Sequence, residues 1–413
     1  MGTPRVLHVL AQRPGHTGSG MTLEALVRAA GARGWEQRVV VGTPLDDPAP
    51  AVGGLAREFV EPLYFASQPG APGAGLPFLV PGMSDVMPYP SSRFSRLERA
   101  EIALYRARWG EHLTRIVERF QPDVIHAHHA WIVGAMLRDL APATPIVLHG
   151  HGTELRQLEL CPHLAREVIE GCRCADRFAL LHAEHARRYG EVYGLRADQV
   201  AVVGAGYRQE LFHARGRATD PGANLVFAGK LSRAKGLPWL LDAVELLAPR
   251  WPGLRLVVAG GGSGIESDTL RERMRSLAPL VELRGELTQV ELGELLRGSS
   301  VFVLPSFSEG LPLVLVEAAA CGCRLVATRL AGIESGLEKP LGGALELVDP
   351  PRFVRADEPE MSDLPGFTNA LAAALERALR RGPLLAEPVA DLELFSWASV
   401  FRRVESLWLE LAS

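Results

Sequence analysis

The chain has 413 residues and a formal net charge of −4, with 22% charged and 47% hydrophobic residues. This length predicts two domains, and the composition is that of a folded globular protein. The charge balance excludes the basic surface of a nucleic-acid-binding protein, and no run of 18 apolar residues could form a transmembrane helix. Lysine is scarce: only Lys230, Lys235 and Lys339 occur among 44 basic residues.

The five cysteines and the N-terminal residues indicate a cytoplasmic protein. An odd number of cysteines in a long chain is typical of reduced thiols. The pairs Cys172/Cys174 and Cys321/Cys323 are separated by one residue, whereas zinc sites usually have a wider gap. We interpret them as small buried side chains. The first apolar run, Val6–Ala11, is too short for a signal peptide.

Strand-like apolar runs alternate with helical patterns along the first half of the chain. The first run, at residues 5–11, is followed by a glycine-rich loop, a helical pattern over 15–34 and a second run at 37–42. Later runs lie at 123–127, 145–150, 177–182 and 199–206. This alternation predicts a parallel α/β domain.

A second series of strand-like runs follows a polar stretch at residues 213–222. Its runs lie at 224–232, 254–262, 281–285, 301–306 and 323–328, again with helical patterns between them. We therefore expect two doubly wound α/β domains, residues 1–213 and 214–395, facing each other across a central cleft. Residues 397–412 form an amphipathic helical pattern at the end of the chain.

Two long segments interrupt the alternation, at residues 62–97 and 337–364. Segments of this length without regular structure are usually functional or disordered. The first contains Pro, Gly and Ser together with Phe, Tyr and Met. We interpret it as a loop on the acceptor side of a binding site, with an ordinary surface loop as the alternative.

The segment 306–323 follows an apolar run and carries two carboxylates, Glu309 and Glu317. Pro312 suits the first turn of a helix, where the backbone N–H groups have no helical partner and can bind a phosphate. Carboxylates beside such a site are poor phosphate ligands but good acceptors for the hydroxyl groups of a sugar. The alternative is that both are solvated surface groups.

The loop 227–236 carries two of the three lysines. Lys230 and Lys235 lie between a predicted strand and a predicted helix, where two ammonium groups can neutralise a diphosphate. Two exposed surface lysines would be the ordinary interpretation, but the scarcity of lysine weakens it.

Glycine- and histidine-rich segments mark the first domain. Gly18 and Gly20 allow a close backbone approach at a helix start, but no dinucleotide pattern G-x-G-x-x-G occurs, which disfavours an NAD-dependent oxidoreductase. The histidines are His126, His128, His129, His149 and His151. Because H-E-x-x-H and D-x-D patterns are missing from the sequence, we expect histidines lining a polar cleft and no metal site.

The order of these segments resembles that of the glycosyltransferases of family 4, which are retaining enzymes. The chain supplies HTGSGM, HAH, HGTEL, VGAGYRQELF, GKLSRAKG and EGLPLVLVEAAACG in the family order. The resemblance implies a GT-B fold, an α/β fold of two Rossmann-like domains, with a C-terminal helix over 396–413 returning to the first domain. Two places depart from the family: the linker at residues 205–208, and the loop LAGIES with the divergent segment after it.

The resemblance also implies a role for each matching residue. Lys230 and Lys235 would hold the donor diphosphate, Glu317 the ribose and Glu309 the transferred sugar, with His128 beside that sugar. The expected catalytic residues are thus His128, Lys230, Lys235 and Glu309. Further expected contacts are Gly310, Leu311, Pro312, Leu313 and Val314 with the sugar and phosphates, Gly285 and Leu287 with the base, Thr17, Gly18 and Gly20 with the phosphates or acceptor, and His151, Thr153 and Glu154 with the acceptor.

The expected reaction is transfer of a hexosyl group from a nucleotide diphosphate sugar, with UDP favoured and GDP next, to a small soluble acceptor. It would proceed with retention, without a metal and without a further cofactor. Three alternatives stay open. They are a lipid or glycan acceptor reached by peripheral contact with a membrane, a nucleotide-sugar epimerase or hydrolase of the same fold, and a non-catalytic nucleotide-sugar-binding protein.

Overall fold

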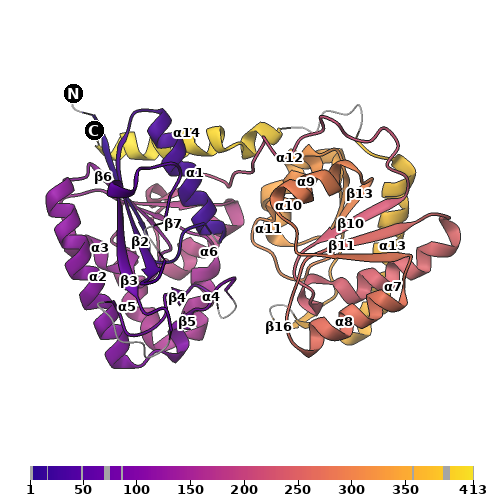
Figure 1. The fold of residues 1–413 in the computed structure, drawn as a ribbon, viewed down its shortest axis with the longest axis horizontal. Helices are drawn as coiled ribbons and strands as arrows, with labels where there is room; N and C mark the ends of the chain where they lie inside the picture. Colours follow the sequence, from indigo (N-terminus) through magenta and orange to yellow (C-terminus); the bar gives the residue numbers. More distant parts are fainter. Residues whose placement is uncertain are drawn as a thin grey trace. The chain divides into compact units, whose positions relative to one another are not determined.

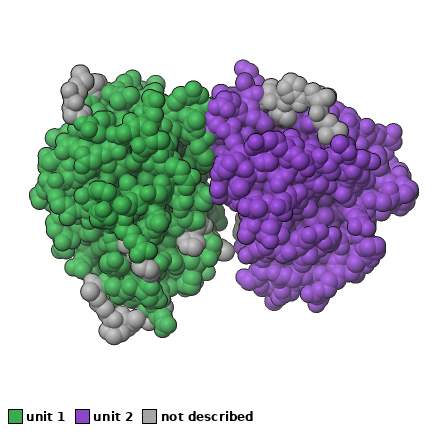
Figure 2. Space-filling view, turned by 45° about the horizontal axis from the view of Figure 1, so that its top comes forward, with its two compact units in different colours: residues 1–205, 397–413 green, residues 206–396 purple. Residues whose placement is uncertain are grey.

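The computed structural model describes residues 3–15, 17–47, 50–68, 75–84, 87–355, 358–384 and 391–412. It divides into two compact units, drawn in different colours in Figure 2. Unit 1 comprises residues 1–205 and 397–413, and unit 2 comprises residues 206–396. Each unit has its own central sheet, as Figure 1 shows.

Unit 1 is built on a seven-stranded sheet with the strand order β3-β2-β1-β6-β7-β8-β9, in which all neighbours are parallel. The strands are β1 (Arg5–Leu10), β2 (Glu36–Pro44), β3 (Val60–Phe65), β6 (Val124–His128), β7 (Ile146–His149), β8 (Arg177–Leu180) and β9 (Val200–Val202). The order reverses between β1 and β6. Ligands of such sheets bind beyond the carboxyl ends of the strands at this switch point.

Helices cover both faces of this sheet. They are α1 (Gly18–Ala32), α2 (Arg99–Phe120), α3 (Ile132–Leu140), α4 (Thr153–Leu160), α5 (Pro162–Cys172), α6 (Ala183–Tyr193) and α14 (Trp397–Ala412). Successive strand residues point to opposite faces, so Val6 packs with α1 and α14 whereas Leu7 packs with α2 and α3. Figure 1 shows α14 lying along α1, where the fully buried Trp408 meets the ring of Trp35 at 5.1 Å.

Unit 2 contains a six-stranded parallel sheet of order β12-β11-β10-β13-β14-β15. Its strands are β10 (Asn224–Ala228), β11 (Arg255–Ala259), β12 (Val281–Gly285), β13 (Val301–Leu304), β14 (Arg324–Thr328) and β15 (Leu345–Val348). Its longer helices are α7 (Leu237–Leu247), α8 (Ile265–Ser276), α9 (Gln289–Arg297), α10 (Leu313–Ala320) and α13 (Leu364–Arg381). The switch point lies between β10 and β13.

The boundary between the units differs from the one expected at residues 213 and 214. The structure places it between Ala205 and Gly206. The N–H of Tyr207 donates to the carbonyl oxygen of Phe395 at 2.9 Å, and Phe212 is buried among side chains of α9 and α10. Residues 206–213 therefore belong to unit 2 because their contacts lie there.

Of the two long segments, the second is largely regular structure, whereas the first is a mostly irregular segment packed on the core of unit 1. Residues 69–74 and 85–86 of the first lie outside the described residues, but Phe78, Met83 and Phe94 are buried in the core of unit 1. The second segment contains β15, which completes the sheet of unit 2, and β16 (Phe353–Arg355), which pairs with β17 (Glu358–Pro359). The second segment is therefore not a long loop. The described residues of the first between β3 and α2 are mostly irregular but packed, and the interpretation of this segment as an acceptor-side loop stays a prediction.

The structure also bears on the expectations for the cysteines and for a membrane-spanning helix. Four cysteines are buried as expected, but Cys174 is exposed, so the interpretation of the paired cysteines as buried side chains is wrong for this residue. Among the described helices, none combines the length and the hydropathy needed to cross a membrane.

Candidate functional site

In unit 2, the loops that follow β10 and β13 lie side by side because these two strands pair. The N–H of Phe307 in the second loop donates to the carbonyl oxygen of Ala234 in the first, at 2.9 Å. A Cβ atom at Gly236 would lie 1.9 Å from the carbonyl oxygen of Pro305, and Gly236 has a φ of +70°. Only glycine permits this approach, so the lysine loop is held against the end of β13.

The structure brings together two of the predicted donor residues from these loops. The Lys235 ammonium lies 2.6 Å from the Glu309 carboxylate, and their side chains are 29% and 13% exposed. Lys230 is exposed on the same loop as Lys235. The lysine loop therefore offers positive charge at the switch point, next to a carboxylate that is only partly exposed.

The helix α10 begins directly after the loop that follows β13 and carries Glu309. Pro312 is its N-cap residue, and the first N–H groups of any helix, here from Leu313 onward, have no partner within it. A Cβ atom placed at Gly310 would meet nothing within 4 Å, so open space lies over the approach to the helix. The backbone of Gly310–Val314 is thus arranged as a site for an anion or a polar ligand.

Glu317 lies on α10, about one turn beyond its start. Burial raises the pKa of Glu317 to about 7, so the carboxyl can exist in either protonation state near neutral pH. Such a group can both accept and donate hydrogen bonds to hydroxyl groups.

The predicted base contacts lie at the end of β12 and just after it. Gly285 ends β12, and its carbonyl oxygen accepts from the N–H of Gly260 at 2.7 Å. Leu287 instead lines a groove of about 540 Å³ with residues such as Arg255 and Glu294, which do not belong to the loops after β10 and β13. The expected contact of Leu287 with the base stays a prediction.

In unit 1, the loop after β1 forms a tight turn into α1. The Thr17 hydroxyl accepts from the N–H of Gly20 at 3.1 Å and caps the helix. A Cβ atom at Gly20 would lie 2.6 Å from the backbone nitrogen of Gly15, whereas one at Gly18 would meet nothing within 4 Å. The Gly18 side of the helix start is therefore the open one. His16 of the HTGSGM motif lies outside the described residues.

Histidine rings from the ends of β1, β6 and β7 lie against one another. The rings of His149 and His151 stack at 4.7 Å, and His128 Nδ1 lies 3.1 Å from His151 Nε2. Trp408 of α14 donates to His126 Nδ1 at 2.8 Å, so a neutral His126 carries its hydrogen on Nε2, which faces His149 Nδ1 at 3.2 Å. The C-terminal helix thus orients the cluster.

Burial keeps these histidines uncharged. It lowers the pKa of His8 to about 4 and that of His149 to about 3. Burial and the neighbouring histidines hold the pKa of His126, His128 and His151 well below its usual value. At neutral pH these rings are polar hydrogen-bonding groups without charge.

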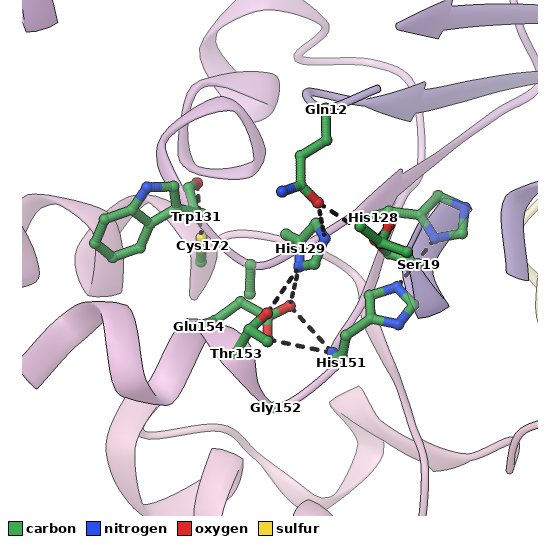
Figure 3. Close-up of polar contacts among 12 residues, drawn as sticks. Gln12, Ser19, His128, His129, Trp131, His151, Gly152, Thr153, Glu154 and Cys172 are labelled. Atoms are coloured by element: carbon green, nitrogen blue, oxygen red, sulfur yellow. Dashed lines mark hydrogen bonds and ion pairs between the residues drawn. The ribbon is translucent and has the colours of Figure 1, made fainter. Parts of the chain in front are cut away.

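A buried carboxylate lies beside the cluster, as Figure 3 shows. Glu154 is fully buried; its carboxylate accepts from the N–H of His151 at 3.1 Å and from the Tyr189 hydroxyl at 2.7 Å. Burial opposes its ionisation, but the His129 ring at 3.0 Å and the Tyr189 hydroxyl outweigh burial and lower the pKa of Glu154. Both oxygens of this predicted acceptor contact are occupied within the protein. Thr153 lies next to it, with Oγ1 3.5 Å from His129 Nδ1.

His129 and Gln12 complete this network, and the sequence did not single out Gln12. His129 has a φ of 74°, and its Nε2 lies 2.9 Å from the Gln12 side-chain oxygen. Both ring nitrogens of His129 therefore face oxygen atoms, the geometry of a doubly protonated ring. A single glutamine after a strand carries no signal of this role, since its partner is 117 residues away.

Among the described residues, no group of three or more His, Cys, Asp or Glu side chains is arranged to hold a metal ion. The adjacent histidines instead bond to one another and to Glu154.

Two family models match the chain. A "Glycosyl transferase 4-like domain" matches residues 17–206, and "Glycosyl transferases group 1" matches residues 222–356. The D-inositol 3-phosphate glycosyltransferase 1 of Catenulispora acidiphila is 31% identical, over 62% of this chain and 68% of its own length. The chain belongs to the group 1 glycosyl transferases. By family, it is an enzyme of the glycosyltransferase class.

A second relative agrees with this membership, and a solved structure agrees with the fold. The D-inositol 3-phosphate glycosyltransferase of Pseudarthrobacter chlorophenolicus is 32% identical to this chain. The aligned region covers 54% of this chain and 59% of that relative's length. The structure of Anabaena HepE in complex with UDP and glucose has a TM-score of 0.62 at 16% identity, over 98% of this chain and 100% of HepE. Together with the two parallel sheets, this likeness confirms the expected GT-B fold class of two Rossmann-like domains.

Proposed function

We propose that this glycosyl transferase moves a sugar from a nucleotide diphosphate sugar to a small soluble acceptor, with retention of configuration and without a metal. The observation that carries the proposal is the arrangement in unit 2. The paired Lys235 and Glu309, the exposed Lys230 and the start of α10 lie together at the switch point of the sheet.

The chemistry of this arrangement fits both parts of such a donor. Lysine ammonium groups and helix N–H groups bind a diphosphate, and the carboxylates Glu309 and Glu317 accept hydrogen bonds from sugar hydroxyls. We favour UDP as the nucleotide, with GDP next. The complex of the similar protein HepE with UDP and glucose supports this preference.

The mechanism follows from where charge develops. As the bond from the sugar to the diphosphate breaks, Lys230, Lys235 and the N–H groups of α10 stabilise the departing oxygen atoms. Because the lysines supply this positive charge, the proposal needs no metal. Glu154 of unit 1 is fully buried with both oxygens occupied, which argues against it as a covalent nucleophile. We therefore propose attack on the same face, with the leaving diphosphate taking the acceptor proton.

The names of the similar enzymes guide the choice of acceptor. Both glycosyltransferases named above act on D-inositol 3-phosphate by their descriptions, and that compound is small and soluble. It supports a small soluble acceptor and is the first compound to test, ahead of lipid and glycan acceptors.

The test uses the full chain with UDP-glucose and GDP-mannose, each with and without D-inositol 3-phosphate. Nucleotide screening by thermal shift identifies the donor base, since a bound ligand raises the apparent stability. We expect nucleoside diphosphate release that depends on the acceptor, and a product whose anomeric configuration by NMR matches the donor. Release without any acceptor would support hydrolysis instead, and binding without turnover over a broad acceptor panel would support a non-catalytic role. An inverted product would refute the retaining mechanism.

A further inference from the structure

Unit 1 encloses a small cavity at the carboxyl ends of β1 and β6. Its volume is about 10 Å³, which is the size needed to hold one water molecule. Its walls include Gln12 from the loop after β1, Met83 and Phe94 from the segment 62–97, Tyr105 of α2, and His129 and Trp131 after β6. The cavity therefore exists only because the long segment folds back over the strand ends.

Two hydrogen-bond donors on the cavity wall, the side-chain nitrogen of Gln12 and the indole nitrogen of Trp131, have no partner among the described residues. His128 also lines the cavity, and its Nε2, a donor or an acceptor depending on the tautomer, has no partner there either. Gln12 is 2% exposed and Trp131 is 3% exposed, so both donors are buried. In Figure 3 the amide nitrogen of Gln12 is on the side of the amide that faces Trp131. Buried donors are almost always satisfied in folded proteins, so these two call for a ligand.

The orientation of the Gln12 amide follows from the charges around it. The buried carboxylate of Glu154 requires a positive partner, and the His129 ring at 3.0 Å supplies it when both ring nitrogens carry hydrogen. Its Nε2–H then needs an oxygen atom, which is the side-chain oxygen of Gln12 at 2.9 Å. That oxygen also accepts from the Ser19 hydroxyl at 3.3 Å. The amide nitrogen is left on the opposite side, toward the cavity.

The remaining wall restricts what the cavity can hold. Met83, Phe94 and Tyr105 present apolar surface or aromatic rings, and the ring of Phe94 holds Trp131 in an edge contact at 5.6 Å. Two N–H donors converge on a space for one atom, which suits an oxygen atom with two lone pairs.

We propose that this cavity binds a single oxygen atom through hydrogen bonds from Gln12 and Trp131. The oxygen belongs either to an ordered water molecule or to a hydroxyl group of the acceptor. Only the second source rests on the proposed function. In both cases Gln12 is a positioning residue, since one end of its amide holds the ligand and the other end holds His129.

The decisive experiment is a high-resolution crystal structure of the full chain, alone and soaked with D-inositol 3-phosphate as the probe. We expect an oxygen peak within hydrogen-bond distance of both nitrogens in at least one of the two crystals. A peak in the free protein that persists identifies water, and a peak that becomes part of the soaked compound identifies an acceptor hydroxyl. No peak in either crystal would overturn the proposal, and this result does not depend on whether the chain transfers a sugar.

Substitution of Trp131 distinguishes the two sources in solution. Trp131→Phe keeps a ring but removes the donor, and Trp239→Phe removes a buried indole from the core of unit 2 as a control. If the oxygen is water, Trp131→Phe lowers the Tm by several degrees more than the control. If it is an acceptor hydroxyl, the KM for the acceptor rises about tenfold at an equal Tm. A Trp131→Phe protein equal to the control in Tm and KM would contradict the proposal. If this variant does not fold, the crystals of the unaltered chain decide.

Discussion

The ammonium of Lys235 and the carboxylate of Glu309 form an ion pair of 2.6 Å at the ends of β10 and β13. The two residues are 74 positions apart and come from different motifs. Each therefore holds the other in place at a site proposed for a diphosphate and a sugar. When a donor binds, Lys235 would exchange the carboxylate for phosphate oxygens, and Glu309 would exchange the ammonium for sugar hydroxyls.

The first prediction concerns Lys235. Lys235→Ala should lower turnover by about a hundredfold or more, because a preorganised charge at the leaving group is lost. Steady-state kinetics measure this, with circular dichroism to show an intact fold. Lys339→Ala is the matched control, because Lys339 lies on a short helix after β14, outside the two donor loops, and should leave turnover unchanged. Turnover of Lys235→Ala close to that of the unaltered enzyme would refute the assigned role.

A double-mutant cycle tests the coupling of the pair. Lys235→Ala and Glu309→Gln should each weaken donor binding, but the double variant should lose less than the sum of the two effects, because either change already breaks the ion pair. Isothermal titration with the intact nucleotide sugar gives the four affinities. Strict additivity would show that the ion pair has no influence on binding.

The third prediction uses the raised pKa of Glu317, which burial moves from 4.5 to about 7. The unfolded protein ionises this group at lower pH than the folded protein. The free energy of unfolding therefore falls as the pH rises from 4.5 to 7, by up to about 3 kcal/mol. Glu317→Gln removes this cost. The variant should be more stable than the unaltered protein at pH 8 but not at pH 4.5. Urea denaturation of the full chain, followed through the unfolding of unit 2, measures this. A constant difference at both pH values would contradict this.

The fourth prediction concerns acid and the histidines of unit 1. Their pKa values are lowered in the folded state, for example to about 4 for His8 and about 3 for His149. Below pH 6.5 the unfolded chain binds protons that the folded chain does not. The free energy of unfolding of unit 1 should then fall by about 1.4 kcal/mol per pH unit for each such histidine.

Hydrogen exchange followed by mass spectrometry measures this within one molecule. Between pH 7 and pH 5, protection of β6 and β7, after correction for the intrinsic rate, should fall more than protection of β10 and β13. The strands of unit 2 serve as the internal control. Equal changes in both units would exclude the buried histidines as the cause.

The fifth prediction follows from the lysines as the source of positive charge. Treatment with EDTA, followed by exchange into metal-free buffer, should leave the transfer rate within about twofold of its starting value, whereas a metal-dependent transferase would lose a catalytic Lewis acid. The rate with and without added Mg²⁺ or Mn²⁺ is the measurement. Strong inhibition by EDTA that either ion reverses would overturn the metal-independent mechanism.

Much of the fold could be predicted from the sequence because its signals are local. A strand of a parallel sheet is covered on both faces, so β6, β10 and β13 appear as short apolar runs between helical patterns. The loops at the ends of such strands carry the ligand-binding residues. For this reason Lys235, Glu309 and Glu317 could be named as candidates without coordinates.

Only the tertiary structure determines which side chains these residues contact. The alternation of residues along a strand predicts which face of the sheet a side chain lies on, but not which strand lies next to it. Only the pairing of β10 with β13 brings Lys235 and Glu309 together. The same limit applies to Glu154, which the motif places beside an acceptor and the structure encloses among His129, His151 and Tyr189. Gln12 depends on a contact 117 residues away. Burial and hydrogen bonding arise from such distant contacts, and these exist only once the strands are assembled.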